Sequence, residues 1–453
     1  MKNHVYRLFT LGLLVILAVA VVVSVRRIQD AQSETMDSEK ISSKLSNIRQ
    51  MDMGNGLTDE MVEDAEIDVE KVEGMSKNFI RGVDASEVIA QENSGVRYYD
   101  DEGKERDIFE IFSDNGINYI KVRIWNDPYD SHGNGYGGGN CDLDNAIKIG
   151  TRAARHSMKL MVNFQYSDFW ADASRQLAPK AWITLDLEEK KKAIAEYTTD
   201  CLQKLEAAGA VIGMVQLGNE TMSSFAGEKD NWENICVLLS AAADAVRQYA
   251  GDKEILIALN FTNPEDRGSF KKIAQILDSY QVDYDVFATT YYPVWNGSLR
   301  NLTRQLSSVA TAYNKKVMVA ETSYVYTLKD SDCYQNTIYD SGLLVPGYPA
   351  TIQGQADMIR DIMQAVADVG ENGIGICYAD AAWISIGDSL EYNKIIWNRY
   401  GTGWASEYAA SYDPDIAGMY GGSEVDNEAF FNANGKVLDS IKVFKYAYSG
   451  AKK

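Results

Sequence analysis

Eight short runs of β-branched and apolar residues follow one another from residue 79 onward, and longer amphipathic stretches separate them. The runs end near Asp84, Ile124, Gln165, Leu217, Asn260, Tyr291, Ala320 and Tyr378. Stretches between them, such as residues 142–156, 187–208, 232–249 and 356–369, repeat apolar residues at the spacing of one helix face. Eight βα units fit a closed barrel better than an open doubly wound sheet, and no GxGxxG or Walker motif favours the open sheet. The sequence therefore predicts an α/β protein, a (β/α)8 TIM barrel over residues 78–450.

The chain begins with a segment unlike the barrel. Residues 8–25 are mostly apolar and carry no charge, and basic residues flank them on both sides. Such a run is long enough to span a membrane, although a small-x-small site at residues 18–20 leaves a cleaved signal peptide open. We therefore predict an N-terminal membrane anchor or signal peptide over residues 1–27. Residues 28–77 are acidic, polar and poor in aromatic residues, which predicts a flexible linker.

Charge and composition limit the partners. The formal net charge is −21, so long-range repulsion opposes binding to nucleic acid and other anionic polymers. The 27 tyrosines and 8 tryptophans suit a carbohydrate-binding surface, although each could equally pack in the core. The five cysteines show no CxxC pair, and we predict neither a disulfide framework nor a zinc site. We expect a monomer acting on a neutral polysaccharide.

Two glutamates follow strands on opposite sides of the predicted barrel. The fourth strand runs into Asn219 and Glu220, and the seventh runs into Glu321. Chemistry in such barrels lies at the carboxyl ends of the strands. Retaining glycoside hydrolysis needs one protonated and one ionised carboxyl group about 5–5.5 Å apart. We predict Glu220 as general acid/base, Glu321 as nucleophile and Asn219 as a ligand of the sugar 2-hydroxyl.

Further polar and aromatic residues stand at the other strand ends. We predict that an arginine in the second strand, Arg123, pairs with the nucleophile and keeps it ionised, and that tyrosine and tryptophan faces stack on sugar rings. A structural ion pair and packing at the rim are the alternatives. The predicted substrate-binding residues are Asp84, Glu87, Arg123, Gln165, Tyr166, Asp168, Trp170, Asn219, Asn260, Tyr291, Tyr292, Trp295 and Trp383.

Several long segments resemble one known family in the same order. They include GVDASEVIAQENSGVRYYDDEG, YIKVRIWNDPYD, QYSDFWAD, GMVQLGNET, TTYYPVW, VMVAETSY and YGTGWASEYAASYDPDIAGMYGGSEVDNEAFF. Together they cover residues 79–448 and resemble glycoside hydrolase family 53. The resemblance implies an endo-β-1,4-galactanase whose acid/base and nucleophile are Glu220 and Glu321.

A loop after the seventh strand carries oxygen ligands at alternate positions: Asp330, Asp332, Tyr334 and Asn336. This spacing lets one loop wrap a single Ca2+, with the tyrosine contributing its backbone carbonyl. Taken alone, the motif could be an ordinary polar turn. The resemblance implies calcium at this loop, because bacterial members bind it there. We predict structural Ca2+ and no organic cofactor.

The chain departs from the family pattern at three strand ends. The family reads DFHYSD where this chain has NFQYSD, has histidine where Asn260 stands, and reads FYWEPAW where this chain has CYADAAW. Ala379 thus replaces the tryptophan that the resemblance places under the cleaved sugar. Gln165 and Asn260 can still hydrogen-bond hydroxyl groups but carry no charge.

These observations predict a retaining endo-β-1,4-galactanase of β-1,4-galactan and arabinogalactan side chains in plant polysaccharide, outside the cell, either anchored or secreted. Two alternatives stay open. One is a barrel hydrolase with altered galactoside specificity. The other is a catalytically weakened glycan-binding protein at the cell surface.

Overall fold

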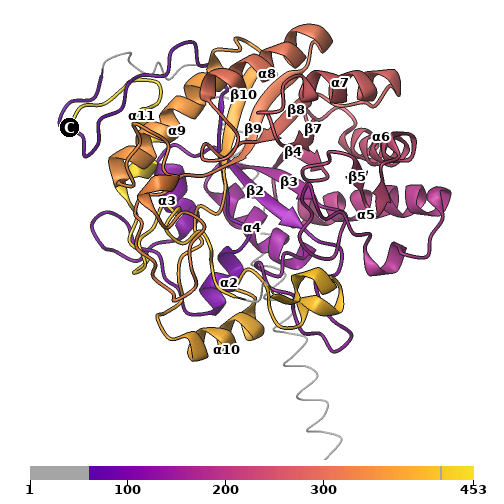
Figure 1. Cartoon of the computed structure of the whole chain (residues 1–453), viewed down its shortest axis with the longest axis horizontal. Coiled ribbons are helices and arrows are strands. Elements are labelled where there is room, and N and C mark those ends of the chain that lie inside the picture. Colours follow the sequence, from indigo (N-terminus) through magenta and orange to yellow (C-terminus); the bar gives the residue numbers. More distant parts are fainter. Residues whose placement is uncertain (1–60, 419–420) are drawn as a thin grey trace, which may run out of the picture. The chain divides into compact units, whose positions relative to one another are not determined.

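Eight parallel strands close into a barrel in the computed structural model, which describes residues 61–418 and 421–453. The strands neighbour one another in the order β1-β10-β9-β8-β7-β4-β3-β2 (Figure 1). Their bounds are β1 Ile80–Asp84, β2 Tyr119–Ile124, β3 Lys159–Phe164, β4 Ile212–Leu217, β7 Leu256–Phe261, β8 Val286–Thr290, β9 Lys316–Thr322 and β10 Gly373–Tyr378. A two-stranded hairpin, β5 Ser224–Phe225 and β6 Glu228–Lys229, follows β4. The predicted TIM barrel is confirmed.

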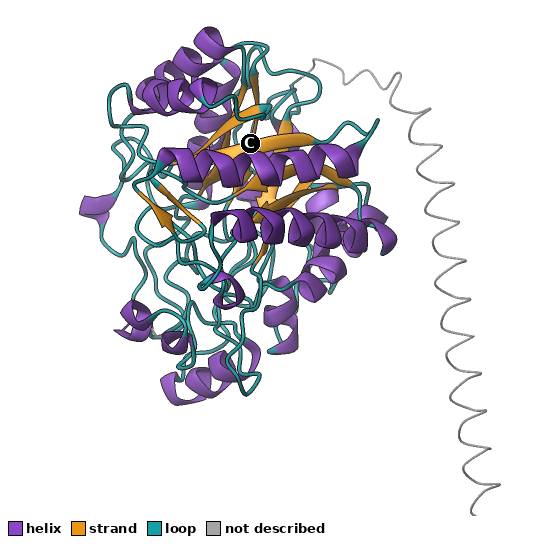
Figure 2. Ribbon diagram, turned by 90° about the vertical axis from the view of Figure 1, so that its right-hand side faces the viewer, coloured by secondary structure: helices purple, strands orange, loops and turns teal. Residues whose placement is uncertain are grey.

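Helices enclose the strands, and long loops gather at one end of the barrel (Figure 2). Their bounds are α2 Val88–Asn93, α3 Ile108–Asp114, α4 Leu143–Arg155, α5 Leu187–Ala207, α6 Trp232–Ala250, α7 Ser269–Ser279, α8 Leu299–Tyr313, α9 Ile352–Ala367, α10 Leu390–Tyr400 and α11 Val443–Tyr446. Side-chain caps fix several starts: Asp142 accepts from the third amide of α4, and Asp186 forms a capping box with Glu189 at α5. The predicted helices therefore begin close to where the structure has them.

The interior of the barrel is filled in layers. Ile80, Met161, Met214, Val286 and Met318 form an apolar cluster together with small alanines. The core between strands and helices is a second, much larger apolar layer. Polar side chains replace apolar ones toward the carboxyl ends of the strands, and these polar side chains line the mouth of the barrel.

Residues 61–77 correct the predicted linker. Val69 pairs with Ala451 through hydrogen bonds in both directions, and Val62 bonds Gly450 and Lys452. Ile67, Val69 and Val72 are each no more than 4% exposed. Apolar residues at alternate positions bury one side of this extended segment, a pattern that the acidic composition concealed.

Side chains of helix α9 hydrogen-bond the backbone of this same segment. Gln353 accepts a hydrogen bond from the Asp68 amide and donates to the Asp68 carbonyl, and Gln364 does the same with Glu73. Arg360 donates to two further carbonyls, those of Glu70 and Lys71. The folded domain therefore begins before residue 78.

The predicted anchor or signal peptide over residues 1–27 lies outside the described residues, as does the linker over residues 28–60. Within the part of the chain that the structure describes, no helix has both the length and the apolar character needed to cross a membrane.

Candidate active site

Glu220 stands three residues beyond the end of β4, in a left-handed backbone conformation with a φ of 48°. Its amide donates to Oδ1 of Asn260 at 2.8 Å, and the amide of Thr221 donates to the Asn260 carbonyl at 2.9 Å. Left-handed backbone is costly for a residue with a Cβ, and these bonds hold it in place. Asn260 was predicted to contact the substrate, but in the structure its oxygen positions Glu220.

The surroundings of the Glu220 carboxyl group stabilise its negative charge only weakly. Burial and the charge of Glu321 raise its pKa to about 7, while a hydrogen bond from the Ala173 amide to Oε2 at 3.1 Å opposes the rise. A carboxyl group that stays protonated near neutral pH can donate a proton to a leaving oxygen. The structure thus gives Glu220 the properties of a general acid.

Glu321 lies near the end of β9 and is surrounded differently. Its Oε1 accepts a hydrogen bond from the Tyr292 hydroxyl at 3.0 Å, and its Oε2 accepts one from Lys121 Nζ at 3.0 Å. A buried cation and a hydroxyl donor both favour an ionised carboxylate. Glu321 is therefore suited to act as nucleophile.

Lys121, rather than Arg123, is the cation beside Glu321, and this corrects the predicted partner. Lys121 is 1% exposed and also lies 3.8 Å from Asp84. Burial alone would lower the pKa of Lys121, but the charges of Glu321 and Asp84 raise it overall. The signal was present in the sequence as a single lysine inside the β2 run YIKVRI, two residues before Arg123.

Arg123 instead joins two other carboxylates of the barrel mouth. Its Nη2 lies 3.5 Å from Glu87 Oε2, and its Nη1 lies 3.3 Å from Asp380 Oδ1. The guanidinium stacks over the ring of Trp170 at 4.4 Å. The ion-pair alternative thus describes Arg123, and Asp380 is a residue of the mouth that the prediction omitted.

Two predicted substrate ligands, Asn219 and Gln165, hold the loop that supports Glu220. Asn219 Nδ2 donates to the Ala171 carbonyl at 3.0 Å, and Gln165 Oε1 accepts from the Ala171 amide at 3.0 Å. Gln165 Oε1 also accepts from Trp125 Nε1 at 2.6 Å. Because Ala173 donates to Glu220, these amides act on the acid through this loop.

Four predicted sugar ligands are almost fully buried in the structure. Tyr166, Asp168, Tyr291 and Trp383 are each at most 1% exposed. Their polar atoms bond other parts of the chain: Tyr166 meets Thr198, Asp168 accepts from the amides of Asp127 and Lys180, Tyr291 donates to Gly297, and Trp383 donates to Thr402. Asp84 and Glu87 are also buried, at 2% and 0%, and act through Lys121 and Arg123.

Three tryptophan side chains retain exposed surface near the site. Trp295 is 51% exposed and lies edge-on to Tyr292 at 5.6 Å. Trp170 is partly buried and stacks against Trp404 at 5.3 Å with an interplanar angle of 14°. Trp404 was not predicted, because it comes from a distant C-terminal segment that only the fold brings beside Trp170.

The candidate metal loop receives a ligand that sequence reasoning missed. Carboxylate oxygens of Asp330, Asp332 and Asp426 lie within 4.8 Å of one another. Both oxygens of Asp426, and both polar side-chain atoms of Asn336, are buried without a hydrogen-bond partner among the described residues. Burial raises the pKa of Asp426 to about 7 and that of Asp332 to about 6. Buried, unsatisfied oxygen ligands of this kind fit a hard divalent ion.

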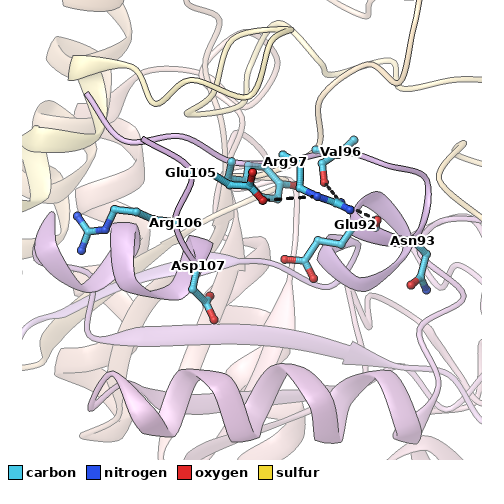
Figure 3. Close-up of a pocket in the computed structure, with 8 residues that line it drawn as sticks. Glu92, Asn93, Val96, Arg97, Glu105, Arg106 and Asp107 are labelled. Atoms are coloured by element: carbon cyan, nitrogen blue, oxygen red, sulfur yellow. Dashed lines mark hydrogen bonds and ion pairs between the residues drawn. The ribbon is translucent and has the colours of Figure 1, made fainter. Parts of the chain in front are cut away.

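A charged surface hollow of about 510 Å³ lies apart from these residues. It is lined by Glu92, Asn93, Val96, Arg97, Tyr98, Glu105, Arg106 and Asp107 (Figure 3). Arg97 pairs with Glu105 at 3.6 Å and donates to the carbonyls of Glu92 and Val96. Arg152 pairs with Glu92 and Asp107, and Arg106 pairs with Asp100, Glu110 and Asp114, so the charges of the hollow are already paired.

Comparisons with known proteins give a consistent set of relatives. The family described as Glycosyl hydrolase family 53 matches residues 80–444. The chain is 54% identical over 385 residues to "Endo-beta-1,4-galactanase" of Bacillus subtilis (strain 168), covering 84% of this chain and 89% of the relative. It is 31% identical over 387 residues to "Arabinogalactan endo-beta-1,4-galactanase" of Cellvibrio japonicus (strain Ueda107), covering 82% and 92%. The solved Ignisphaera aggregans GH53 catalytic domain aligns with a TM-score of 0.75 at 35% identity, covering 84% of this chain and 99% of that chain.

Proposed function

This chain belongs to glycosyl hydrolase family 53, and we propose that it is a retaining endo-β-1,4-galactanase acting on β-1,4-galactan and arabinogalactan side chains. The observation that carries the proposal is the unequal environment of two glutamates at one barrel mouth. Glu220 is partly buried with its pKa raised to about 7, and Glu321 is hydrogen-bonded by Lys121 and Tyr292. The relatives named as galactanases support the substrate class.

In the first step, ionised Glu321 attacks the anomeric carbon of the bound sugar. The glycosidic bond breaks, its electron pair goes to the leaving oxygen, and Glu220 supplies the proton. Tyr292 and Lys121 hold the two oxygens of Glu321, which fixes the direction of the attacking carboxylate. The product is an ester between Glu321 and the sugar.

In the second step, Glu220 takes a proton from water, and the water oxygen attacks the anomeric carbon. The bond between that carbon and Glu321 breaks, and its electron pair returns to Glu321 as a carboxylate. Formation of the ester has removed the negative charge of Glu321, which is one cause of the raised pKa of Glu220. The pKa of Glu220 therefore falls when it must act as a base. The same side chain serves both steps, and the sugar is released with its original configuration.

The proposal is tested with a panel of galactan, arabinogalactan, xylan, mannan and β-glucan, measuring reducing sugar and the anomer first released. We expect release from the two galactans only, with the β-anomer appearing first. Initial α-anomer would contradict retention, and release from another polysaccharide alone would contradict the substrate. Binding without release would favour the glycan-binding alternative.

We also propose that Asp330, Asp332, Asn336 and Asp426, with the backbone carbonyl of Tyr334, hold a structural Ca2+. The clustered carboxylates and the unpartnered oxygens of Asp426 support it. When bound, the ion would neutralise the carboxylates and join the loop around residue 332 to the C-terminal segment around residue 426. It would stabilise the fold without taking part in the chemistry.

Finally, we propose that the protein acts outside the cell. The support is the uncharged apolar run over residues 8–25 and a substrate that is a large extracellular polymer. N-terminal sequencing of the mature protein distinguishes the two forms: an intact start indicates an anchor, and a new start after residue 20 indicates a signal peptide.

A further inference from the structure

The segment that follows β10 presents one side chain to the barrel mouth. Ala379, Ala381, Ala382 and Trp383 are between 0% and 4% exposed. Asp380, in the middle of this run, has a side chain that is 16% exposed. Because the side chains of its neighbours are buried, Asp380 is the residue of this run whose side chain can contact a ligand in the mouth.

The backbone around Asp380 is held from both sides. The Ala379 amide donates to the Thr322 carbonyl of β9 at 2.8 Å, and the Ala381 amide donates to the Asp84 carbonyl of β1 at 3.3 Å. Asp380 itself has a φ of 49°, in the left-handed region that non-glycine residues rarely adopt. The hydrogen bonds to β9, which carries Glu321, and to β1 hold Asp380 in this conformation. The conformation in turn sets the direction of the Asp380 side chain.

Only one oxygen of the Asp380 carboxylate hydrogen-bonds a protein group in the described part of the chain. Its Oδ1 lies 3.3 Å from Arg123 Nη1, and Oδ2 has no hydrogen-bond partner among the described residues. Arg123 is itself fixed by Glu87 and by the ring of Trp170. One oxygen is thus anchored, and the other is available to a ligand.

The backbone contact with β9 places this carboxylate near the nucleophile, because the Ala379 amide bonds the carbonyl of Thr322, the residue after Glu321. A sugar bound at the nucleophile therefore lies close to this part of the wall. Burial and the charges of Asp84 and Glu321 raise the pKa of Asp380 to about 6, and Arg123 opposes the rise. Both oxygens of Glu321 already have protein partners, so Asp380 Oδ2 is the less occupied acceptor.

We propose that Asp380 accepts a hydrogen bond from a hydroxyl group of the sugar unit attacked by Glu321, and so helps to select that sugar. The inference rests on the proposed galactanase function. A carboxylate–hydroxyl bond is charge-assisted and stronger than a neutral one. It also selects against uronic acids, because a second carboxylate would be repelled there. With Ala379 at the position where the resemblance places tryptophan, recognition at this wall depends on hydrogen bonding rather than stacking.

The test is a double-mutant cycle between enzyme and substrate. The substrates are p-nitrophenyl β-1,4-galactobioside and three analogues that lack the 2-, 3- or 6-hydroxyl on the sugar bearing the nitrophenyl group. On the parent substrate, Asp380→Ala should lower kcat/KM by roughly 10- to 100-fold, the range for a hydrogen bond to a charged group. On one analogue, the same variant should lose no more than about twofold, because the partner hydroxyl is already absent.

Glu87→Gln is the matched control, since it removes the other carboxylate beside Arg123 without facing the mouth. Its losses should be the same on all four substrates. Asp380→Asn, which keeps the shape, serves if the alanine variant fails to fold, as judged by its thermal midpoint, and should show the same dependence on one hydroxyl. Equal losses on every substrate, or no loss on the parent, would overturn the role of Asp380. If the wild-type enzyme releases nothing from galactan, the proposed function fails instead.

Discussion

The two halves of the barrel mouth are built from different chemistry. Around Glu220, strands β3, β4 and β7 provide neutral amides, including Asn163, Gln165, Gln216 and Asn260. Around Glu321, strands β1, β2 and β10 provide charged side chains that alternate in sign. The comparison explains how two identical side chains take opposite roles, because amides cannot stabilise a carboxylate charge as a buried lysine can.

The largest expected loss of activity comes from removing Glu321, the central carboxylate of the charged half. Glu321→Gln should lower kcat on galactan by on the order of 10⁴-fold or more, because no covalent intermediate can form. Reducing-sugar release measures the loss, and a nearly unchanged thermal midpoint shows that the fold survives. Glu188→Gln on the exposed face of α5 is the control and should retain full activity. Substantial turnover by Glu321→Gln would remove the nucleophile assignment.

The two cations of the charged half can be separated by matched substitutions. Lys121→Met should lower kcat by about 10²- to 10³-fold, because the nucleophile loses its buried cation. Arg123→Met should lower kcat less, since Arg123 contacts Glu87 and Asp380 rather than Glu321. Reducing-sugar release from galactan makes the comparison. A larger loss in the Arg123 variant would restore the original assignment.

Glu220, in the amide half, should determine the alkaline limb of the pH profile of kcat/KM. The pKa of Glu220 is raised to about 7, so kcat/KM on galactan should fall about tenfold per pH unit above that value as the acid loses its proton. Substrates with activated aryl leaving groups need less protonation and should show a weaker decline. Glu220→Ala should remove the limb and slow galactan far more than the aryl substrates. An alkaline limb that persists in this variant would belong to another group.

The smallest expected effect lies away from both halves. Removing Ca2+ with EDTA should lower the thermal midpoint by several degrees at neutral pH, and added Ca2+ should restore it by mass action on the native state. Asp426→Asn should reproduce the chelator effect, whereas Glu188→Gln should not. The raised pKa values of Asp332 and Asp426 sharpen the test, because the stabilisation of the metal-free protein by their protonated forms is lost as pH rises toward about 7. A midpoint independent of calcium would refute the site.

Features that follow from local pattern were predictable. The alternation of strand and helix periods identified all eight barrel strands, and glutamates at the carboxyl ends of strands were candidates for the barrel mouth. The family resemblance placed Glu220 and Glu321 on the same positions, and the family match confirms that resemblance. The loop from Asp330 to Asn336 was visible because its oxygen ligands are close in sequence.

Features that depend on burial or on distant segments were decided by tertiary structure. Tyr166 and Asp168 follow a strand just as Gln165 does, yet only packing shows that they turn away from the mouth. Asp426 joins Asp332 across a long stretch of chain, and residues 61–77 find their partners at the C-terminus. Sequence by itself determined which residues could carry charge at the strand ends. Which of Lys121 and Arg123 meets Glu321 depended on depth within the barrel, because two residues along a strand change the carboxylate that a side chain can reach.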